Sequence, residues 1–206
     1  EVDTKDIKTF RLRFVNQEDE GKFKYIPGQF GELSIFGKGE SPIGIASSPT
    51  QPGYIEFTVQ RAGVVTSALH DMEPGTLMGV RGPLGNSWPI EYLQGKNIVI
   101  VGGGFAFTTL RSLLNYMIHE SNRSRFGNIM VIYGARNLVL LIYTAELEVW
   151  GKRSVITLNV TVVKADAGWT VREVLVPTAC MEVVLCSDNV VSVIFGPAFW
   201  FRLTLP

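Results

Sequence analysis

Hydrophobic positions in the first half of the chain recur with the two-residue period of β-strands. In the segment FRLRFV, Phe10, Leu12 and Phe14 fall on one face, while Arg11 and Arg13 fall on the other. Three segments of the same kind follow: GELSIFG (31–37), YIEFTVQR (54–61) and TLMGVRG (76–82). Glycine- and proline-rich turns separate these strands, and one helical turn is expected at 64–72. Many short strands with regular turns predict a small antiparallel β-barrel.

From residue 97 onward the hydrophobic pattern changes its period. NIVIVGGG (97–104) is a continuous apolar run, as expected of a parallel strand covered on both faces. The next segment (109–120) has helical spacing, with an apolar stripe of Leu110, Leu113, Leu114, Met117 and Ile118. Further strands are expected at 127–136, 157–165 and 189–200, and a helix at 143–152. Alternating strands and helices predict a doubly wound parallel sheet, so we divide the chain into domains 1–95 and 96–206.

Composition restricts the classes of function. The chain has 206 residues, is 46% hydrophobic and carries 19 basic and 19 acidic side chains, which argues against a general nucleic-acid or anionic-membrane binder. No apolar run reaches the ~20 residues of a spanning helix. Cys180 and Cys186 do not have the spacing of a zinc site, and we expect no metal site. With reduced cysteines and no signal peptide, the sequence predicts a cytoplasmic protein.

The glycines Gly102, Gly103 and Gly104 stand between a predicted buried strand and a predicted helix. Such a turn can bind a phosphate at the helix N-terminus, or it can be only a tight corner in a packed core. The third glycine of the GxGxxG pattern is missing, because Phe107 or Thr108 stands in its place. Arg136, which ends the next predicted strand, could meet a phosphate or simply lie exposed. The residues alone leave both alternatives open.

Six segments in a fixed order nevertheless resemble the ferredoxin–NADP reductase superfamily. They are PGQF (27–30), SPIGIASSP (41–49), GVVTSALHDMEPGTLMGVRGPLGN (63–86), VGGGFAFTTLRSLLNY (101–116), YGAR (133–136) and FGPAFW (195–200). The likeness extends over nearly the whole chain. It is greatest to the branch of electron-transfer subunits of hydrogenases, sulfite reductases, dihydroorotate dehydrogenase and bifurcating transhydrogenases.

The resemblance implies that an FAD lies between a barrel domain and a nicotinamide-binding domain. Its flavin is expected along the strand that contains Ile43, Gly44 and Ile45. Its diphosphate is expected at the short helix that follows Gly63, and the resemblance implies Val65, Thr66 and Ser67 as further FAD-binding residues, with Thr66 and Ser67 as hydroxyl donors.

For NAD(P)H, the resemblance implies Gly102, Gly103, Gly104, Arg136, Gly196 and Pro197 as binding residues. The chemistry would be hydride transfer from nicotinamide C4 to flavin N5, which needs stacking and orientation rather than an acid or base. The pattern leaves NADH and NADPH as alternatives. This chemistry agrees with a sequence that lacks a catalytic constellation. We interpret His70 as a capping or surface residue, with a role as proton donor as the alternative.

Several positions depart from the family pattern. Gly44 replaces a serine whose hydroxyl would bond near flavin N5. Ala106 and Thr109 stand where the glycine loop usually has Gly and Pro, and Phe195 replaces a cysteine. The polar loop that usually follows YGAR is here NLVLLIY, which is a possible partner interface. The cysteine-rich iron–sulfur segment found at the end of many members has no counterpart here. Either the chain is C-terminally incomplete, which we expect, or the segment is disordered, or this member lacks the cluster.

Two functions follow as hypotheses. The first is an FAD-dependent reductase subunit that transfers electrons between NAD(P)H and an iron–sulfur partner subunit. The second is a non-catalytic flavin-relay or docking subunit of a redox complex, which the departures at Gly44, Ala106 and Phe195 favour. A free-standing dehydrogenase is disfavoured because no acid–base residue is evident. Trp200 stays open as an aromatic cover for the flavin.

Overall fold

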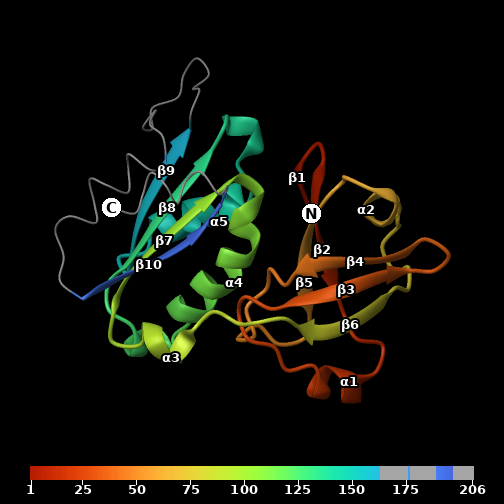
Figure 1. Cartoon of the computed structure of the whole chain (residues 1–206), viewed down its shortest axis with the longest axis horizontal. Coiled ribbons are helices and arrows are strands. Elements are labelled where there is room, and N and C mark those ends of the chain that lie inside the picture. Colours follow the sequence, from red (N-terminus) through yellow and green to blue (C-terminus); the bar gives the residue numbers. More distant parts are fainter. Residues whose placement is uncertain (163–175, 177–188, 197–206) are drawn as a thin grey trace. The chain divides into compact units, whose positions relative to one another are not determined.

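The computed structural model describes residues 1–162, 176 and 189–196, and its chain divides into two compact units. The first unit consists of Glu1–Trp88 together with Arg111–Tyr116, and the second of Pro89–Leu110 and Met117–Pro206. Each unit contains its own sheet structure (Figure 1).

The first unit contains two antiparallel sheets of three strands each. One has the order β1 (Val2–Thr4), β2 (Ile7–Leu12), β5 (Ile55–Gln60). The other has the order β4 (Gly39–Gly44), β3 (Phe30–Ile35), β6 (Gly79–Leu84). An isolated bridge between Ile45 and Phe57 links the end of β4 to β5. Two short helices accompany the sheets, α1 (Gln17–Lys22) and α2 (Val64–His70).

The core of this unit lies between its sheets and α2. Its buried members are Leu33, Ile45, Ile55, Phe57, Val59 and Leu69, and partly buried side chains such as Phe10, Leu12 and Phe14 pack against them. The predicted alternation along residues 10–14 is therefore confirmed, since Arg11 and Arg13 are exposed. Burial of these side chains is the main stabilising contribution to the unit.

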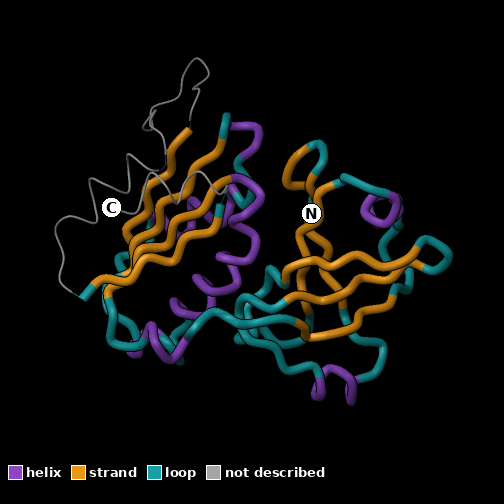
Figure 2. The backbone as a smooth tube through the Cα atoms, in the orientation of Figure 1, coloured by secondary structure: helices purple, strands orange, loops and turns teal. Residues whose placement is uncertain are grey.

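The second unit is built on four parallel strands that lie side by side (Figure 2). In spatial order they are β10 (Val190–Phe195), β7 (Asn97–Gly103), β8 (Ile129–Ala135) and β9 (Ile156–Val162). The chain adds β8 and β9 on one side of β7 and then returns to place β10 on the other side. The sheet therefore has a topological switch point between β7 and β10.

The described helices of this part of the chain are α3 (Ile90–Leu93), α4 (Phe107–Ile118) and α5 (Thr144–Gly151). Short 3-10 turns occur at Gly104–Ala106, Arg123–Arg125 and Leu138–Leu140. Residues 98–101 of β7 are all at most 5% exposed, so this strand is covered on both faces as predicted. The whole apolar stripe predicted for α4 is buried.

An antiparallel β part followed by a parallel α/β part confirms the predicted fold class. Some element bounds differ from the prediction. Strand β2 ends at Leu12. Strand β6 begins only at Gly79, because Thr76 forms a turn in which its backbone N–H and its hydroxyl both donate to the carbonyl of Glu73. Helix α1 was not predicted, since its residues QEDEGK include no buried side chain and give no apolar period.

His70 corrects another expectation. It is only 5% exposed, its Nε2 donates to the carbonyl of Val59 at 2.9 Å, and its ring meets the edge of Phe10. His70 is therefore a core residue with a satisfied hydrogen bond, and not a surface or capping residue. Its alternative role as a proton donor has no support from this geometry.

Candidate cofactor-binding site

The turn that opens α2 is shaped by the hydroxyl of Thr66. This oxygen accepts hydrogen bonds from the N–H groups of Ala62 (2.9 Å) and Gly63 (2.8 Å), and it lies 3.2 Å from the carbonyl of Gly63, to which it donates. Its hydrogen is thus directed to the backbone rather than to a ligand. This differs from the expected role of Thr66 as a hydroxyl donor, and leaves it the role of holding the loop in shape.

The space beside the same turn suits a phosphate group. A side chain added at Gly63 would meet nothing within 4 Å, and the first turn of α2 contains no acidic residue. A hollow of about 730 Å³ opens here, with Gly63, Ser67 and the cation Lys38 in its lining. Asp71 also lines the hollow, but its carboxylate is paired with Arg61. A helix start and a lysine near open space fit the diphosphate of an FAD.

In the predicted flavin strand, main-chain atoms are more available for contacts with a ligand than side chains are. Ile45 is 1% exposed and belongs to the core, and its N–H donates to the carbonyl of Gln29 at 3.0 Å. Ile43 is partly buried and packs against the same core, and Gly44 is paired with Phe30 in the β3–β4 register. The Ile45 side chain is therefore unavailable to a ligand, and contacts of this segment would come from main-chain atoms.

The predicted FAD-binding residues are not gathered in one cluster. A side chain at Gly39 would lie 3.7 Å from Cγ2 of Val65, so the start of α2 is next to the first residue of β4. Gly44 and Ile45 follow at the other end of that strand, about 17 Å away at roughly 3.4 Å per residue. An elongated ligand with a ring at one end and a charged group at the other suits such a separation.

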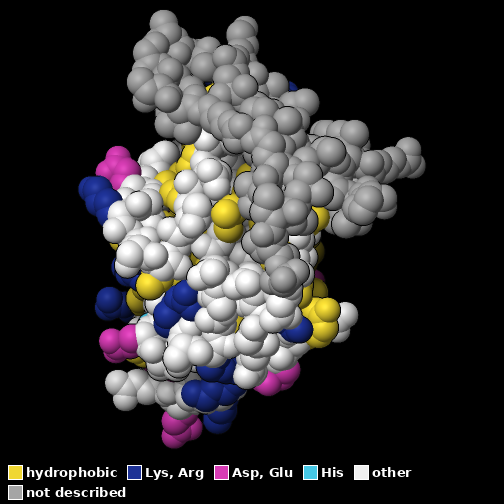
Figure 3. All heavy atoms as spheres, turned by 90° about the vertical axis from the view of Figure 1, so that its left-hand side faces the viewer, with side chains coloured by type: hydrophobic (Ala, Val, Ile, Leu, Met, Phe, Trp, Pro, Cys, Tyr) yellow, Lys and Arg dark blue, Asp and Glu magenta, His cyan; other side chains and the backbone are white. Residues whose placement is uncertain are grey.

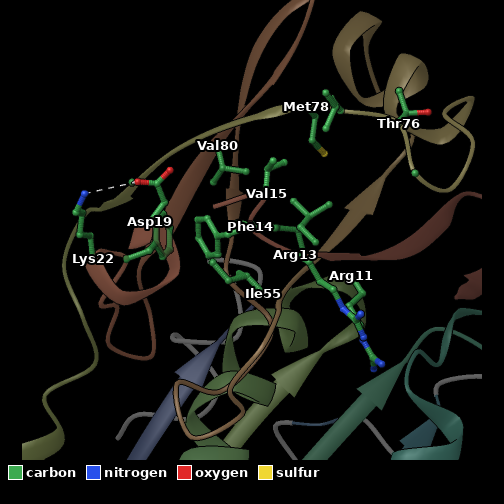
Figure 4. Close-up of a pocket in the computed structure, with 16 residues that line it drawn as sticks. Arg11, Arg13, Phe14, Val15, Asp19, Lys22, Ile55, Thr76, Met78 and Val80 are labelled. Atoms are coloured by element: carbon green, nitrogen blue, oxygen red, sulfur yellow. Dashed lines mark ion pairs between the residues drawn. The ribbon is translucent and has the colours of Figure 1, made fainter. Parts of the chain in front are cut away.

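A further cavity in the first unit contains none of these residues (Figure 4). It has a volume of about 760 Å³, apolar walls that include Phe14, Ile55 and Val80, and basic side chains such as Arg13 and Lys22 in its lining. Lys22 is paired with Asp19 at 3.9 Å. The predicted FAD-binding residues therefore do not lead to this cavity.

In the second unit, the strand register brings the predicted NAD(P)-binding residues to one edge of the sheet. Phe195 at the end of β10 is opposite Gly102, and Gly134 at the end of β8 is opposite Gly103. Gly104, Arg136 and Gly196 each follow the carboxyl end of one of these three adjacent strands. Ligands bind outside this edge, at the switch point, in open parallel sheets. Pro197 lies outside the described residues.

The two outer glycines of the turn have different physical roles. A Cβ on Gly102 would come within 2.5 Å of Phe107 Cδ2 and 2.8 Å of Leu110 Cδ1, so its absence lets α4 pack closely on β7. Gly104 has a φ of +51° and open space beside it. Gly102 is thus a packing residue, while Gly104 makes the turn and leaves room for a ligand. The packed-corner alternative therefore applies to Gly102, while Gly104 keeps the open space that the phosphate alternative requires.

Two residues to which the sequence assigned no role act on this turn. The Tyr133 hydroxyl lies 3.4 Å from the carbonyl of Gly104 and accepts the N–H of Ile142 at 3.1 Å, while its ring stacks on Phe107. Tyr133 therefore connects the glycine turn to the loop after β8. Thr109, in the first turn of α4, has a buried hydroxyl without a hydrogen-bond partner. A polar ligand group at the helix start would satisfy such a hydroxyl, so the turn fits a nicotinamide dinucleotide.

The structure accounts for one departure from the family pattern. Ala106 has φ −62° and ψ −19°, a helical conformation in which alanine is favourable and glycine is not needed. Phe195, in place of the usual cysteine, is 43% exposed and presents an aromatic ring at the carboxyl edge. Gly44 lacks the hydroxyl that the family serine would supply.

The charged side chains agree with a protein of zero net charge. Basic and acidic groups are interspersed on the visible part of the face in Figure 3. Across the described part of the chain, no three His, Cys, Asp or Glu side chains form a group able to hold a metal ion. No helix within the described residues has both the length and the apolarity to cross a bilayer. Cys180 and Cys186 lie outside the described residues.

Two protein-family models match the chain, one for each part of it. The oxidoreductase FAD-binding domain matches residues 2–88, and the oxidoreductase NAD-binding domain matches residues 100–199. Their succession, on this fold, decides the family. The chain belongs to the ferredoxin–NADP reductase superfamily. The predicted cofactors, FAD and a nicotinamide dinucleotide, and the prediction of a flavoprotein oxidoreductase are confirmed at the level of these domains.

The curated relatives of this superfamily member include subunits of larger enzymes. The chain is 39% identical over 145 residues to the Sulfhydrogenase 1 subunit gamma of Pyrococcus furiosus, with 70% of this chain and 49% of the relative covered. It is 30% identical over 133 residues to a probable dihydroorotate dehydrogenase B electron transfer subunit of Thermococcus kodakarensis, with 65% and 48% covered. The chain thus spans about half the length of the curated relatives that it matches.

Solved structures of the superfamily have the same fold. An NADH-dependent reduced ferredoxin–NADP oxidoreductase is 25% identical, with a TM-score of 0.73 over 97% of this chain and 66% of that chain. The ferredoxin–NADP reductase of Neisseria gonorrhoeae, solved with bound FAD and NADP, is 17% identical, with a TM-score of 0.76 over 97% and 82%. The second likeness concerns the fold alone.

Proposed function

We propose that this chain is the FAD-dependent reductase subunit of a redox complex, in which it transfers electrons between NAD(P)H and an iron–sulfur partner subunit. In this proposal residues 1–95 bind FAD, residues 96–206 bind the nicotinamide dinucleotide, and the complex is cytoplasmic. The observation that carries it is the open space beside both predicted phosphate turns, at Gly63 and at Gly104. The names of the sulfhydrogenase and electron-transfer relatives support the assignment to a complex.

The residues of the first unit have binding and orienting roles. Ile43 and Gly44 offer main-chain groups at one end of β4, while Gly63, Val65, Thr66 and Ser67 form the turn for the diphosphate near its other end. Thr66 keeps that turn in shape through its own hydrogen bonds to Ala62 and Gly63. FAD, when bound, supplies the acceptance of a hydride from NAD(P)H and the release of single electrons.

The residues of the second unit place the nicotinamide dinucleotide at the switch point. Gly103 and Gly104 allow close approach of a phosphate to the start of α4, and Gly196 follows the neighbouring strand. Arg136 lies exposed one residue beyond β8, where a guanidinium can pair with a phosphate of the dinucleotide. No described residue is needed as a general acid or base, because a hydride moves between the two cofactors.

The test begins with the purified full chain and added FAD. Binding is measured by quenching of flavin fluorescence, and NADH or NADPH is then added without oxygen. We expect the yellow colour to bleach, and electrons to reach an added iron–sulfur acceptor protein. A folded chain that binds no added FAD would refute the proposal.

The contribution of Arg136 is measured with Arg136→Gln. Its matched control is Arg153→Gln. Arg153 is also exposed, but it precedes β9 and so lies at the amino-terminal ends of the strands, away from the carboxyl ends where Arg136 lies. We expect only Arg136→Gln to raise the KM for the nicotinamide, and a larger increase for NADPH would identify the ribose phosphate as its partner. Equal KM values in both variants would remove Arg136 from the site.

A non-catalytic flavin-relay or docking subunit is the second candidate. Phe195 favours it, because an exposed aromatic ring stands at the carboxyl edge where the family has a cysteine. This candidate predicts a yellow protein that neither NADH nor NADPH bleaches, although dithionite does. The same titration therefore distinguishes the two candidates.

A further inference from the structure

A buried carboxylate lies directly behind the segment that follows the predicted flavin strand. Glu56, on β5, is 3% exposed. Its Oε1 lies 2.9 Å from Nε of Arg11, and its Oε2 lies 2.8 Å from Nη1 of Arg111. Arg11 also lies over the Tyr54 ring, and hydrogen bonding to Glu56 raises the pKa of Arg11. All of these residues belong to the first unit.

Arg111 and its neighbour Ser112 hold two successive carbonyls of that segment. The guanidinium of Arg111 donates to the carbonyl of Ala46 at 3.0 Å, in addition to its bond with Glu56. The hydroxyl of Ser112 donates to the carbonyl of Ser47 at 2.6 Å. Arg111 is 5% exposed and Ser112 is fully buried, so water does not compete for these bonds. The main chain immediately after Ile45 is therefore fixed by two side chains of α4.

The same segment is also held by β5 and by the chain that precedes β3. Ala46 N–H donates to the carbonyl of Glu56 at 2.8 Å, and the N–H of Glu56 donates to the Ser47 hydroxyl at 2.9 Å. That hydroxyl also bonds to the Tyr25 hydroxyl at 2.9 Å. The N–H of Ile45, one residue before Ala46, donates to the carbonyl of Gln29. Three successive residues thus have partners on several elements, and their main chain is confined to one position.

Stability alone gives little reason for the charged pair. Burying two charges is expensive, and well-packed apolar residues in their place are often as stable or more stable. Apolar side chains in place of the pair could not hold the carbonyl of Ala46, to which Arg111 donates. A binding strand that acts through main-chain groups needs those groups held to within about 0.5 Å, since hydrogen bonds weaken quickly with distance and angle.

We propose that Glu56 and Arg111 are positioning residues for the flavin: they fix the main chain at Ala46 and Ser47 and thereby set the main-chain groups of Gly44 and the carbonyl of Ile45. This inference rests on the proposed function, because it assumes that FAD lies along Ile43–Ile45. Neither residue touches the cofactor. Ser112 has the same role with a single neutral hydrogen bond.

The test uses the full chain with three substitutions. Glu56→Gln keeps the shape and removes the charge, Ser112→Ala removes one hydroxyl with little risk to folding, and E56L/R111M replaces the whole pair by apolar side chains. The matched control is Glu40→Gln, because Glu40 is also a glutamate paired with an arginine, Arg81 at 3.0 Å, but both side chains are exposed. Each variant is measured for apo melting temperature, for the FAD dissociation constant and for the visible spectrum of the bound flavin.

We expect Glu56→Gln to raise the FAD dissociation constant about tenfold or more and Ser112→Ala about threefold, since each tenfold change corresponds to the loss of a good hydrogen bond. Both should also shift the flavin absorption bands, which report hydrogen bonding to the ring. E56L/R111M should regain the melting temperature of the wild type but not its FAD affinity. Glu40→Gln should match the wild type in every measurement.

The outcomes separate this inference from the proposed function. A wild-type chain that is folded and binds no FAD would refute both. If the wild type binds FAD and the folded variants bind it equally well with an unchanged spectrum, only the positioning role is overturned, and the pair is structural. Should Glu56→Gln fail to fold, Ser112→Ala and E56L/R111M decide: wild-type FAD affinity in both would overturn the inference.

Discussion

Alanine at Gly102 tests the packing role that the structure gives to this glycine. The main chain of Gly102 lies outside the left-handed region, so alanine can adopt its conformation. The added methyl carbon would nevertheless meet Phe107 Cδ2 at 2.5 Å and Leu110 Cδ1 at 2.8 Å. Both side chains are fully buried. Phe107 is held by Tyr133 at 4.3 Å and Trp150 at 6.0 Å between ring centroids, so it cannot turn away without disturbing them.

Two opposing effects give the magnitude. Replacing glycine by alanine in a compatible conformation stabilises a protein by about 0.4–1 kcal/mol, because the unfolded chain loses freedom. Adding a methyl group to a packed core costs about 1–3 kcal/mol. The cost of overpacking exceeds the gain from the unfolded chain. We therefore expect a net loss of ~1–2 kcal/mol, which lowers the melting temperature by roughly 2–8 °C for a chain of this length that melts as one unit.

The assay is calorimetric melting of the wild type, of Gly102→Ala and of a control, Gly151→Ala. At Gly151, the last residue of α5, the new carbon would lie 3.6 Å from Leu158, an ordinary contact, so this substitution should raise stability slightly. The same substitution, glycine to alanine, is thus expected to lower the melting temperature at residue 102 and to raise it at residue 151. If Gly102→Ala melts at or above the wild-type temperature, α4 is not pressed against β7 and our assignment of this glycine is wrong.

Three further outcomes follow from single contacts. Thr66→Val should destabilise the first unit by about 1–2 kcal/mol in urea unfolding, because the N–H groups of Ala62 and Gly63 lose their acceptor. Thr66→Ser should restore the stability, and a valine variant as stable as the wild type would contradict this. Tyr133→Phe should cost about 1–3 kcal/mol, since the buried N–H of Ile142 is left without its acceptor, and an unchanged denaturation midpoint would argue against that bond. Burial raises the pKa of Tyr25 from 10.0 to about 12, so the folded state holds this proton more tightly than the unfolded state; its contribution to stability is complete below pH 10 and is lost as the pH rises towards 12. The difference in unfolding free energy between the wild type and Tyr25→Phe should fall across that window, and a difference that is constant with pH would refute the assignment.

Much of the fold was predictable because its signals are local. The two-residue period of residues 10–14 and the continuous apolar run at 97–101 each identify a strand from neighbouring residues alone. The apolar stripe of α4 likewise needs only its own twelve residues. Helix α1 escaped prediction for the converse reason, since its polar residues bury nothing and leave no period to detect.

The sites could be predicted only in part. The glycines at 102–104 and Gly63 were recognisable as turns where a phosphate could approach, and the parallel sheet could be expected to bring residues at strand ends together. The sequence could not distinguish Gly102 from Gly104, because the distinction depends on which side chain occupies the space beside each α-carbon. Thr66 illustrates the same limit, since a hydroxyl can serve a ligand or its own backbone.

The sequence by itself determined the order and type of the main elements and the family to which the chain belongs, because periodicity and short motifs are properties of adjacent residues. Only the tertiary structure decided which polar groups meet. Arg111 reaches Ala46 and Glu56 across 65 and 55 residues, and Tyr133 reaches Gly104 across 29. Such contacts leave no mark on local patterns, since their partners become neighbours only when the core has packed.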